Sequence, residues 1–226
     1  MSCGKIQKRE FKTAEDLVRA VANLLEERFT RSFGRPHAVM LSGGRTPLPA
    51  YGEVKNRRLH GAEDLYVLFS DERMVPPDSP ESNYGNVRCM LNSAGIADER
   101  VIRVQTGLPV KAAAAQYDKA LQQFVKCGGR ITLGLLGLGA DGHTASLFSS
   151  DQIQGAAGAY AMAVPRKEGP SRVSVTPGLL KRVEAIIFLA VGREKREIVS
   201  RLLVEPDQVP AGLAVREAPA VQVWVA

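Results

Sequence analysis

The sequence has few cysteines, few aromatic residues and no long hydrophobic run, and each shortage excludes a class of protein. Three cysteines (Cys3, Cys89 and Cys127) are too few and too widely spaced for a disulfide framework or a cysteine-rich metal site. Such sparse use of cysteine is typical of a reducing cytoplasm. The apolar run from Ala185 to Val191 is far too short to span a bilayer, and the N-terminus shows no secretory signal. We therefore expect a cytoplasmic protein that has no membrane partner.

The composition is that of an ordinary globular protein. Hydrophobic residues make up 45% of the chain and charged residues 24%, which argues against disorder. A length of 226 residues suits one fair-sized domain or at most two small ones. Because the chain shows no internal repeat, low-complexity tract or obvious linker, we expect residues 1–226 to form a single domain.

The positive charge is concentrated at one end of the chain. Residues 1–60 hold 12 basic and 6 acidic residues, whereas the rest of the chain holds 18 of each. Such a bias suits a nucleic-acid partner or the attraction of a small anionic substrate. Aromatic residues are only 6% of the chain and the basic residues are dispersed, so we expect no nucleic-acid partner. A solvated helix face near the N-terminus accounts for much of the charge.

Apolar strands alternate with amphipathic helices along the whole chain. This alternation predicts an α/β fold with a Rossmann-like, mainly parallel sheet, helices on both faces and short additional strands. Thr13 to Asp16 resembles a capping box, Thr46 is predicted to cap a helix with Pro47 in its first turn, and Asn83 to cap another. Strands are expected at 38–41, 65–69, 101–104, 131–136, 161–164, 173–175, 185–191 and 221–225.

Polar clusters follow three of these predicted strands. They are Ser42-Gly43-Gly44, Asp71-Glu72-Arg73 and Asp141-Gly142-His143. Ligands of open α/β sheets bind beyond the carboxyl ends of the strands. The three clusters therefore indicate a single binding site.

The third cluster lies in a glycine-rich segment. Gly137, Gly139 and Gly142 match the G-x-G-x-x-G pattern of dinucleotide sites, but no acidic residue ends the next strand, and no Gly-Lys-Ser/Thr closes a P-loop. We interpret the glycines as a tight turn that aims His143. A lone histidine is more often structural, yet His143 follows a buried strand and lies two residues after Asp141, which suits proton transfer.

The other two clusters each allow a simple structural interpretation beside a functional one. Ser42-Gly43-Gly44 is either a plain glycine turn or a cradle of backbone N–H groups for a phosphate. Asp71-Glu72-Arg73 is either an exposed ion-pair cluster or a rigid, polar pocket wall. No set of histidine, cysteine and carboxylate residues has the spacing of a metal site, and the nucleophile elbow of the serine hydrolases is missing.

Taken together, five segments resemble the 6-phosphogluconolactonase family. They occur in the family's order and span about residues 38–226. The Asp-Gly-His-Thr-Ala-Ser-Leu-Phe and Asp-Glu-Arg-x-Val-Pro runs are the specific ones. The segments are Leu41 to Pro47, Ser70 to Pro76 followed by Ser82-Asn83, Leu138 to Phe148, Arg172 to Thr176, and Val191 to Lys195.

The resemblance implies hydrolysis of 6-phospho-D-glucono-1,5-lactone in the oxidative pentose phosphate pathway, with no cofactor and no metal. Glucosamine-6-phosphate deaminases share the fold and the Asp-Gly-His turn, but there the turn typically continues Ile-Ala-Phe-Asn-Glu. Here Thr144-Ala-Ser-Leu-Phe148 follows, which favours the lactonase. A deaminase-like enzyme and a non-catalytic sugar-phosphate-binding protein stay open as alternatives.

On this basis we assign roles to the polar residues. His143 is the general base that activates water, with Asp141 or Glu72 orienting its ring or holding sugar hydroxyls. Asp71 is a candidate hydroxyl binder. The phosphate ligands are expected to be Ser42, Gly43, Gly44, Arg73 and Lys195, with Arg172 and Arg45 as additions; many lactonases have a small serine where Arg45 stands. We expect a monomer whose partner is a small-molecule sugar-phosphate lactone.

Overall fold

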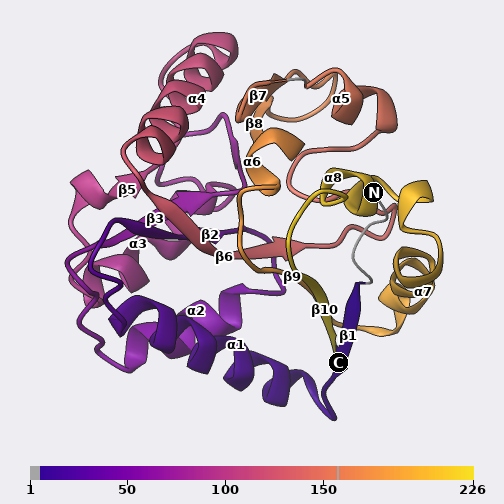
Figure 1. The fold of residues 1–226 in the computed structure, drawn as a ribbon, viewed down its shortest axis with the longest axis horizontal. Coiled ribbons are helices and arrows are strands. Elements are labelled where there is room, and N and C mark those ends of the chain that lie inside the picture. Colours follow the sequence, from indigo (N-terminus) through magenta and orange to yellow (C-terminus); the bar gives the residue numbers. More distant parts are fainter. Residues whose placement is uncertain (1–5, 157) are drawn as a thin grey trace.

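A seven-stranded sheet forms the centre of the structure, a computed structural model that describes residues 6–156 and 158–226 (Figure 1). Its strand order is β1-β10-β9-β6-β2-β3-β5, and all neighbouring strands are parallel, as the sequence predicted. The strands are β1 (Gln7–Glu10), β2 (His37–Leu41), β3 (Leu65–Phe69), β5 (Val101–Ile102), β6 (Arg130–Gly137), β9 (Ile186–Ala190) and β10 (Val221–Val225).

Helices cover both faces of this sheet. On one face lie α1 (Ala14–Thr30), α2 (Leu48–Asn56) and α3 (Asn83–Ser93). On the other lie α4 (Val110–Lys126), α5 (Ser150–Gln154), α6 (Pro177–Leu180), α7 (Arg196–Val204) and α8 (Pro210–Ala214) (Figure 1). Each strand contributes side chains to both hydrophobic layers, because alternate side chains of a strand point to opposite faces of the sheet. In β9, Ile187 and Leu189 pack on the α1 side, and Phe188 and Ala190 pack on the α7 side.

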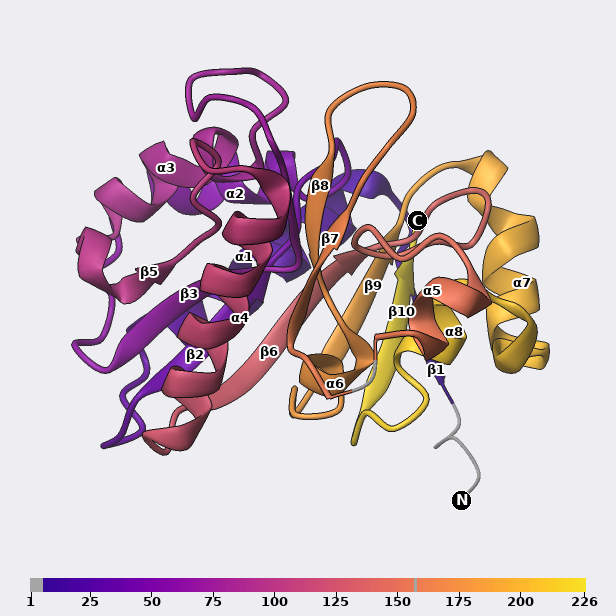
Figure 2. The same ribbon diagram turned by 90° about the horizontal axis from the view of Figure 1, so that it is seen from above.

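A small antiparallel sheet adjoins the large one. It consists of β4 (Asp71–Arg73), β8 (Arg172–Val175) and β7 (Ala161–Val164), in that order. Only Ser70 separates β3 from β4, so the chain passes directly from one sheet to the other. The polar cluster 71–73 is therefore itself a strand, with Arg73 paired to Arg172 across the ladder. Figure 2 shows β7 and β8 rising beside β6 and β9.

One predicted helix cap is confirmed and two are wrong. Thr13 caps α1, its hydroxyl accepting the Asp16 N–H at 3.1 Å. Pro47 rather than Thr46 occupies the N-cap position of α2, and its ring cannot make a capping hydrogen bond. Ser82 rather than Asn83 caps α3 by accepting the Gly85 N–H at 3.0 Å. The side chain of Asn83 is consequently available for contacts outside the helix.

Three further observations concern the described residues only. Cys89 and Cys127 are exposed and carry free thiols, while Cys3 lies outside the described part of the chain. Within that part, no helix combines the length and the apolar character needed to cross a membrane. Nor do the described histidine, cysteine and carboxylate side chains gather anywhere in a group of three that could hold a metal ion.

Candidate active site

A cavity of about 170 Å³ lies at the carboxyl ends of β2, β3 and β6. The chain leaves β2 for α2 on one face of the sheet and leaves β6 for α5 on the other. This divergence of neighbouring strands opens a crevice, the usual ligand site of such sheets. Residues from all three polar clusters line it, together with Arg172: Ser42, Gly43, Gly44, Arg45, Asp71, Arg73, Asn83, Gly139 and His143.

The turn after β6 presents His143 to this cavity. Gly139 donates its N–H to the His143 carbonyl at 2.8 Å, and Gly142, at a φ of 86°, donates to the Gly139 carbonyl at 3.0 Å. A Cβ atom on Gly139 would lie only 2.2 Å from Nδ1 of His143 and 2.4 Å from Oδ1 of Asp141. The glycines form the tight turn that the sequence predicted, and Gly139 leaves room for the side chains of His143 and Asp141.

Asp141 holds the imidazole ring. Its Oδ1 lies 2.5 Å from Nδ1 of His143 and also accepts the His143 backbone N–H at 3.2 Å. Partial burial acts to raise the pKa of Asp141, but the hydrogen bonds from His143 outweigh it and lower the pKa below its usual value. The ring also packs against Phe148, with centroids 4.7 Å apart. A carboxylate on Nδ1 stabilises the tautomer in which Nε2 is basic.

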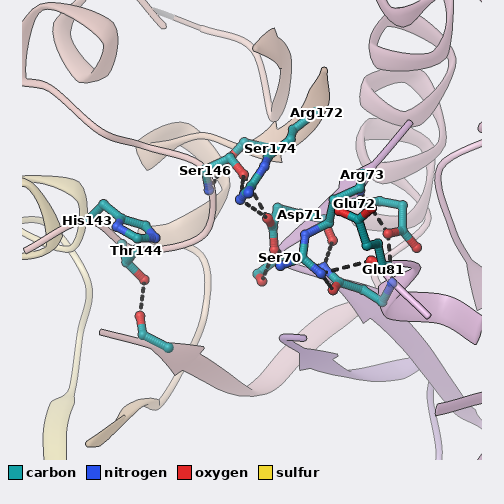
Figure 3. A network of polar contacts seen from close by, with 12 residues as sticks. Ser70, Asp71, Glu72, Arg73, Glu81, His143, Thr144, Ser146, Arg172 and Ser174 are labelled. Carbon is teal, nitrogen blue, oxygen red and sulfur yellow. Dashed lines mark hydrogen bonds and ion pairs between the residues drawn. The ribbon is translucent and has the colours of Figure 1, made fainter. Parts of the chain in front are cut away.

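The opposite wall of the cavity is centred on Asp71, which is buried (Figure 3). Its Oδ2 accepts the Ser146 hydroxyl at 2.7 Å and lies 3.9 Å from Nη1 of Arg172. Its Oδ1 accepts Nδ2 of Asn83 at 3.1 Å and the Ser70 hydroxyl at 3.3 Å. These contacts fix the Asp71 carboxylate at the cavity wall, and its assignment as a binder of sugar hydroxyls stays a prediction.

Three residues that line this cavity each have a buried hydrogen-bond donor without a partner among the described residues. The donors are Nε of Arg73, Nε of Arg172 and the hydroxyl of Ser42. Arg73 is held by Nη1, which donates to Oδ1 of Asn83 at 2.8 Å, and burial lowers the pKa of Arg172. An unpartnered buried polar group costs about 1–3 kcal/mol. The three arginines that line the cavity, Arg45, Arg73 and Arg172, favour an anionic ligand through their positive charge.

The loop after β2 fits closely against Asn83. A Cβ atom on Gly43 would lie 1.7 Å from Oδ1 of Asn83, and the Tyr51 hydroxyl donates to the Ser42 carbonyl at 2.9 Å. Gly44 has a φ of 90°, which glycine adopts without strain. Sequence reasoning missed Asn83 as a site residue because it was assigned to the helix cap; its place in the Ser82-Asn83 motif was the available signal.

Glu72 does not take part in the cavity. Its buried carboxylate accepts the backbone N–H groups of Arg73, Asn83 and Tyr84, each at 2.8 Å, and the Ser82 hydroxyl at 3.2 Å. Burial raises its pKa. The expectation that Glu72 orients His143 or holds sugar is therefore corrected: it holds the N-terminus of α3 in place, because that helix start needs acceptors for its free N–H groups.

The two remaining predicted residues lie at the margin of the cavity. Arg45 lines it with an exposed side chain. Lys195 precedes α7, and its Nζ donates to the carbonyl of Leu138, a lining residue, at 2.7 Å. Lys195 itself lines the neighbouring, larger cavity, so the structure places its charge behind the wall of the site rather than inside it.

Comparisons with known proteins agree with this architecture. The chain is 34% identical over 182 residues to a 6-phosphogluconolactonase of Synechocystis, covering 76% of this chain and 75% of the relative. It is 33% identical over 168 residues to that of Thermotoga maritima, covering 73% and 74%. The crystal structure of a 6-phosphogluconolactonase from Thermotoga maritima superposes with a TM-score of 0.78 at 26% identity, covering 98% of this chain and 99% of that one.

A second solved structure, a 6-phosphogluconolactonase from Trypanosoma cruzi, has a TM-score of 0.82 at 25% identity, covering 100% of this chain and 96% of that one. At the family level, residues 12–224 match the family described as glucosamine-6-phosphate isomerases/6-phosphogluconolactonase. This match spans nearly the whole sequence and includes every segment that lines the cavity. The chain therefore belongs to the glucosamine-6-phosphate isomerase/6-phosphogluconolactonase family.

Proposed function

We propose that this protein hydrolyses 6-phospho-D-glucono-1,5-lactone to 6-phospho-D-gluconate in the oxidative pentose phosphate pathway. The observation that carries the proposal is one small cavity with a carboxylate-held histidine on one wall and two arginines, Arg73 and Arg172, on the other. Proton transfer and anion binding are the two capacities that hydrolysis of a phosphorylated lactone requires. The relatives that carry the name 6-phosphogluconolactonase support the same substrate.

His143 supplies the proton transfer in this proposal. Its Nε2 removes a proton from water as the water oxygen attacks the lactone carbonyl carbon, which gives a tetrahedral oxyanion and an imidazolium. The carbonyl then re-forms, the bond to the ring oxygen breaks, and the imidazolium returns its proton to that oxygen. Asp141 holds Nδ1 and stabilises the charged ring throughout.

The opposite wall and the β2 loop bind the phosphate. The Ser42 hydroxyl, the N–H groups of Gly43 and Gly44, and the guanidinium groups of Arg73 and Arg172 are the donors. Arg45 and Lys195 add positive charge from the margin. Fixing the phosphate holds the distant carbonyl beside His143, so a phosphate contact contributes to turnover as well as to affinity.

All of these groups come from one chain, and we extend the proposal to a monomer acting in the cytoplasm. Size-exclusion chromatography with light scattering tests the monomer. A mass of about twice the 24.4 kDa of the chain would contradict it. Fractionation of cells that make the protein tests its location.

The experiment that tests the activity follows the disappearance of freshly prepared lactone. The rate with protein is compared with the spontaneous rate and with the rate of the non-phosphorylated lactone. We expect kcat/KM to be about 10- to 150-fold higher for the phosphorylated lactone, because a charge-assisted anchor contributes about 1.5–3 kcal/mol. Tight binding of 6-phosphogluconate without faster hydrolysis would indicate a binding protein, and ammonia release from glucosamine 6-phosphate would indicate a deaminase.

A further inference from the structure

A second, larger cavity of about 850 Å³ lies beyond the carboxyl ends of β1, β9 and β10. Strand β1 leads into α1 on one face of the sheet, and β9 leads into α7 on the other, with β10 between them. The strands therefore diverge here as they do at the catalytic cavity, and such divergence is where open α/β sheets bind ligands. Figure 1 shows α7 beside β10 and β1, on the side away from β3 and β5.

One wall of this crevice is a single face of α7. Arg196, Val199, Ser200 and Leu203 line it, and their spacing of three, one and three residues places them on one side of a helix. The facing wall comes from β1 and the segment after it, which includes Phe11. Apolar side chains from both walls thus meet a polar rim, a composition typical of sites for organic ligands.

The rim of the crevice is strongly basic. Lys8, Lys12, Arg193, Lys195 and Arg196 line it. The one carboxylate side chain in the lining, that of Glu10, is paired with Lys8. Within residues 6–156 and 158–226, the other four cations form no ion pair.

Lys8 and Lys12 also belong to the N-terminal excess of positive charge. Of the basic residues among residues 1–60, the lining of the catalytic cavity includes Arg45. The crevice and the catalytic cavity share no lining residue, although the Lys195–Leu138 hydrogen bond joins them. A ligand of the crevice can therefore be held while the catalytic cavity is occupied.

We propose that this crevice binds a nucleoside diphosphate or triphosphate. The phosphates lie against the basic rim, and the base lies against the apolar surface of Phe11, Val199 and Leu203. A volume of about 850 Å³ is within the range of about 300–1,000 Å³ of small-molecule sites. The apolar walls disfavour a bare polyphosphate, and the concentrated positive charge disfavours an uncharged nucleoside.

The experiment is a calorimetric titration at low salt with ADP, ATP, adenosine and tripolyphosphate as separate arms. Saturating 6-phosphogluconate is included in a parallel series to fill the catalytic cavity. We expect ADP and ATP to bind at least tenfold more tightly than adenosine or tripolyphosphate, with or without 6-phosphogluconate. Rising salt should weaken the binding, because exposed charges are screened.

Two charge reversals locate the site. Lys12→Glu and Arg196→Glu are each expected to weaken ADP binding about 5- to 20-fold, the effect of replacing an exposed attraction by a repulsion. Lys119→Glu, on the exposed surface of α4, is the matched control and should leave binding unchanged. Circular dichroism checks that all three variants fold.

Four outcomes would overturn the inference. They are failure of ADP and ATP to bind, equal binding of tripolyphosphate or adenosine, full displacement of ADP by 6-phosphogluconate, and ADP binding that neither reversal weakens. ADP titrated into the wild type requires no lactonase activity. Failure of the proposed lactonase function is therefore distinguishable from failure of this inference.

Discussion

The two walls of the catalytic cavity are built in opposite ways. On one wall, the side chains of His143 and Asp141 are 30% and 64% exposed, and a single glycine turn holds them. On the other, the side chains of Arg172 and Asp71 are 21% and 7% exposed. Asn83 and Ser146, from separate segments, each donate a hydrogen bond to Asp71, and Figure 3 shows the contact from Ser146.

This difference follows from what each wall does in the proposed reaction. A group that takes up and releases a proton needs access to water and to the reacting atoms. Groups that only bind charge work best when they are fixed in advance and shielded from water. Loss of the exposed wall should therefore mainly lower turnover, with little loss of stability. Loss of the buried wall should mainly lower stability and substrate affinity, with a smaller loss of turnover.

The largest expected effect is on the exposed wall. His143→Ala should lower kcat about 10²- to 10⁴-fold, the contribution of a positioned general base, and should leave the melting temperature nearly unchanged. The lactone assay and thermal melting measure the two quantities. His60→Ala, at another exposed histidine outside the cavity, is the control. A folded His143→Ala protein with near-normal kcat would contradict the assignment of His143 as the general base.

Asp141→Asn should lower kcat about 10- to 100-fold, because an amide holds Nδ1 less well than a carboxylate. The pKa of Asp141 is lower in the folded chain than its usual value. The ionised carboxylate therefore stabilises the fold above the ordinary aspartate pKa of about 4, and this contribution is lost as the pH falls through the lowered pKa. Urea unfolding should show the variant slightly less stable at pH 7 and equally stable at the acid end; a difference that grows on acidification would contradict this role of the carboxylate.

A pair of glycine substitutions tests the turn itself. Gly139→Ala should lower kcat about 10-fold, because its methyl group would overlap Nδ1 of His143 and Oδ1 of Asp141 and displace the ring. Gly137→Ala is the matched control, since a Cβ atom there meets nothing within 4 Å. Equal kcat values for the two variants would mean that the turn does not position the ring.

The smallest effect on turnover is expected from the buried wall. Gly43→Ala would force a methyl group onto Asn83, which Arg73 and Asp71 hold in place. The free energy of unfolding should fall by about 1–3 kcal/mol, and KM should rise a few-fold with a smaller fall in kcat, because the phosphate contact contributes to both. Gly52→Ala, in an exposed and open position of α2, should instead stabilise the protein slightly. If Gly43→Ala lowered kcat alone, without a change in stability or KM, the two walls would not differ in the way described.

Much of the fold could be predicted from local patterns. The strands at 65–69, 161–164 and 221–225 have the predicted bounds, because apolar runs between turn residues are strong strand signals. Strand β1 was missed, since all four of its residues are exposed and it is a strand only through its pairing with β10. The short helices α5, α6 and α8 have four or five residues each, too few for a helical period to show.

The amino-acid sequence by itself determined the alternation of strands and helices, the placement of three polar clusters near strand ends, and the glycine turn that carries His143. Only the tertiary structure decided which acid serves which purpose. Asp141 contacts the ring of His143, and Asp71 accepts a hydrogen bond from Ser146, 75 positions away in the sequence. Glu72 accepts a backbone N–H at the start of α3. The physical reason is that a buried carboxylate is directed by the donors packed around it, and those donors come from segments that only folding brings together.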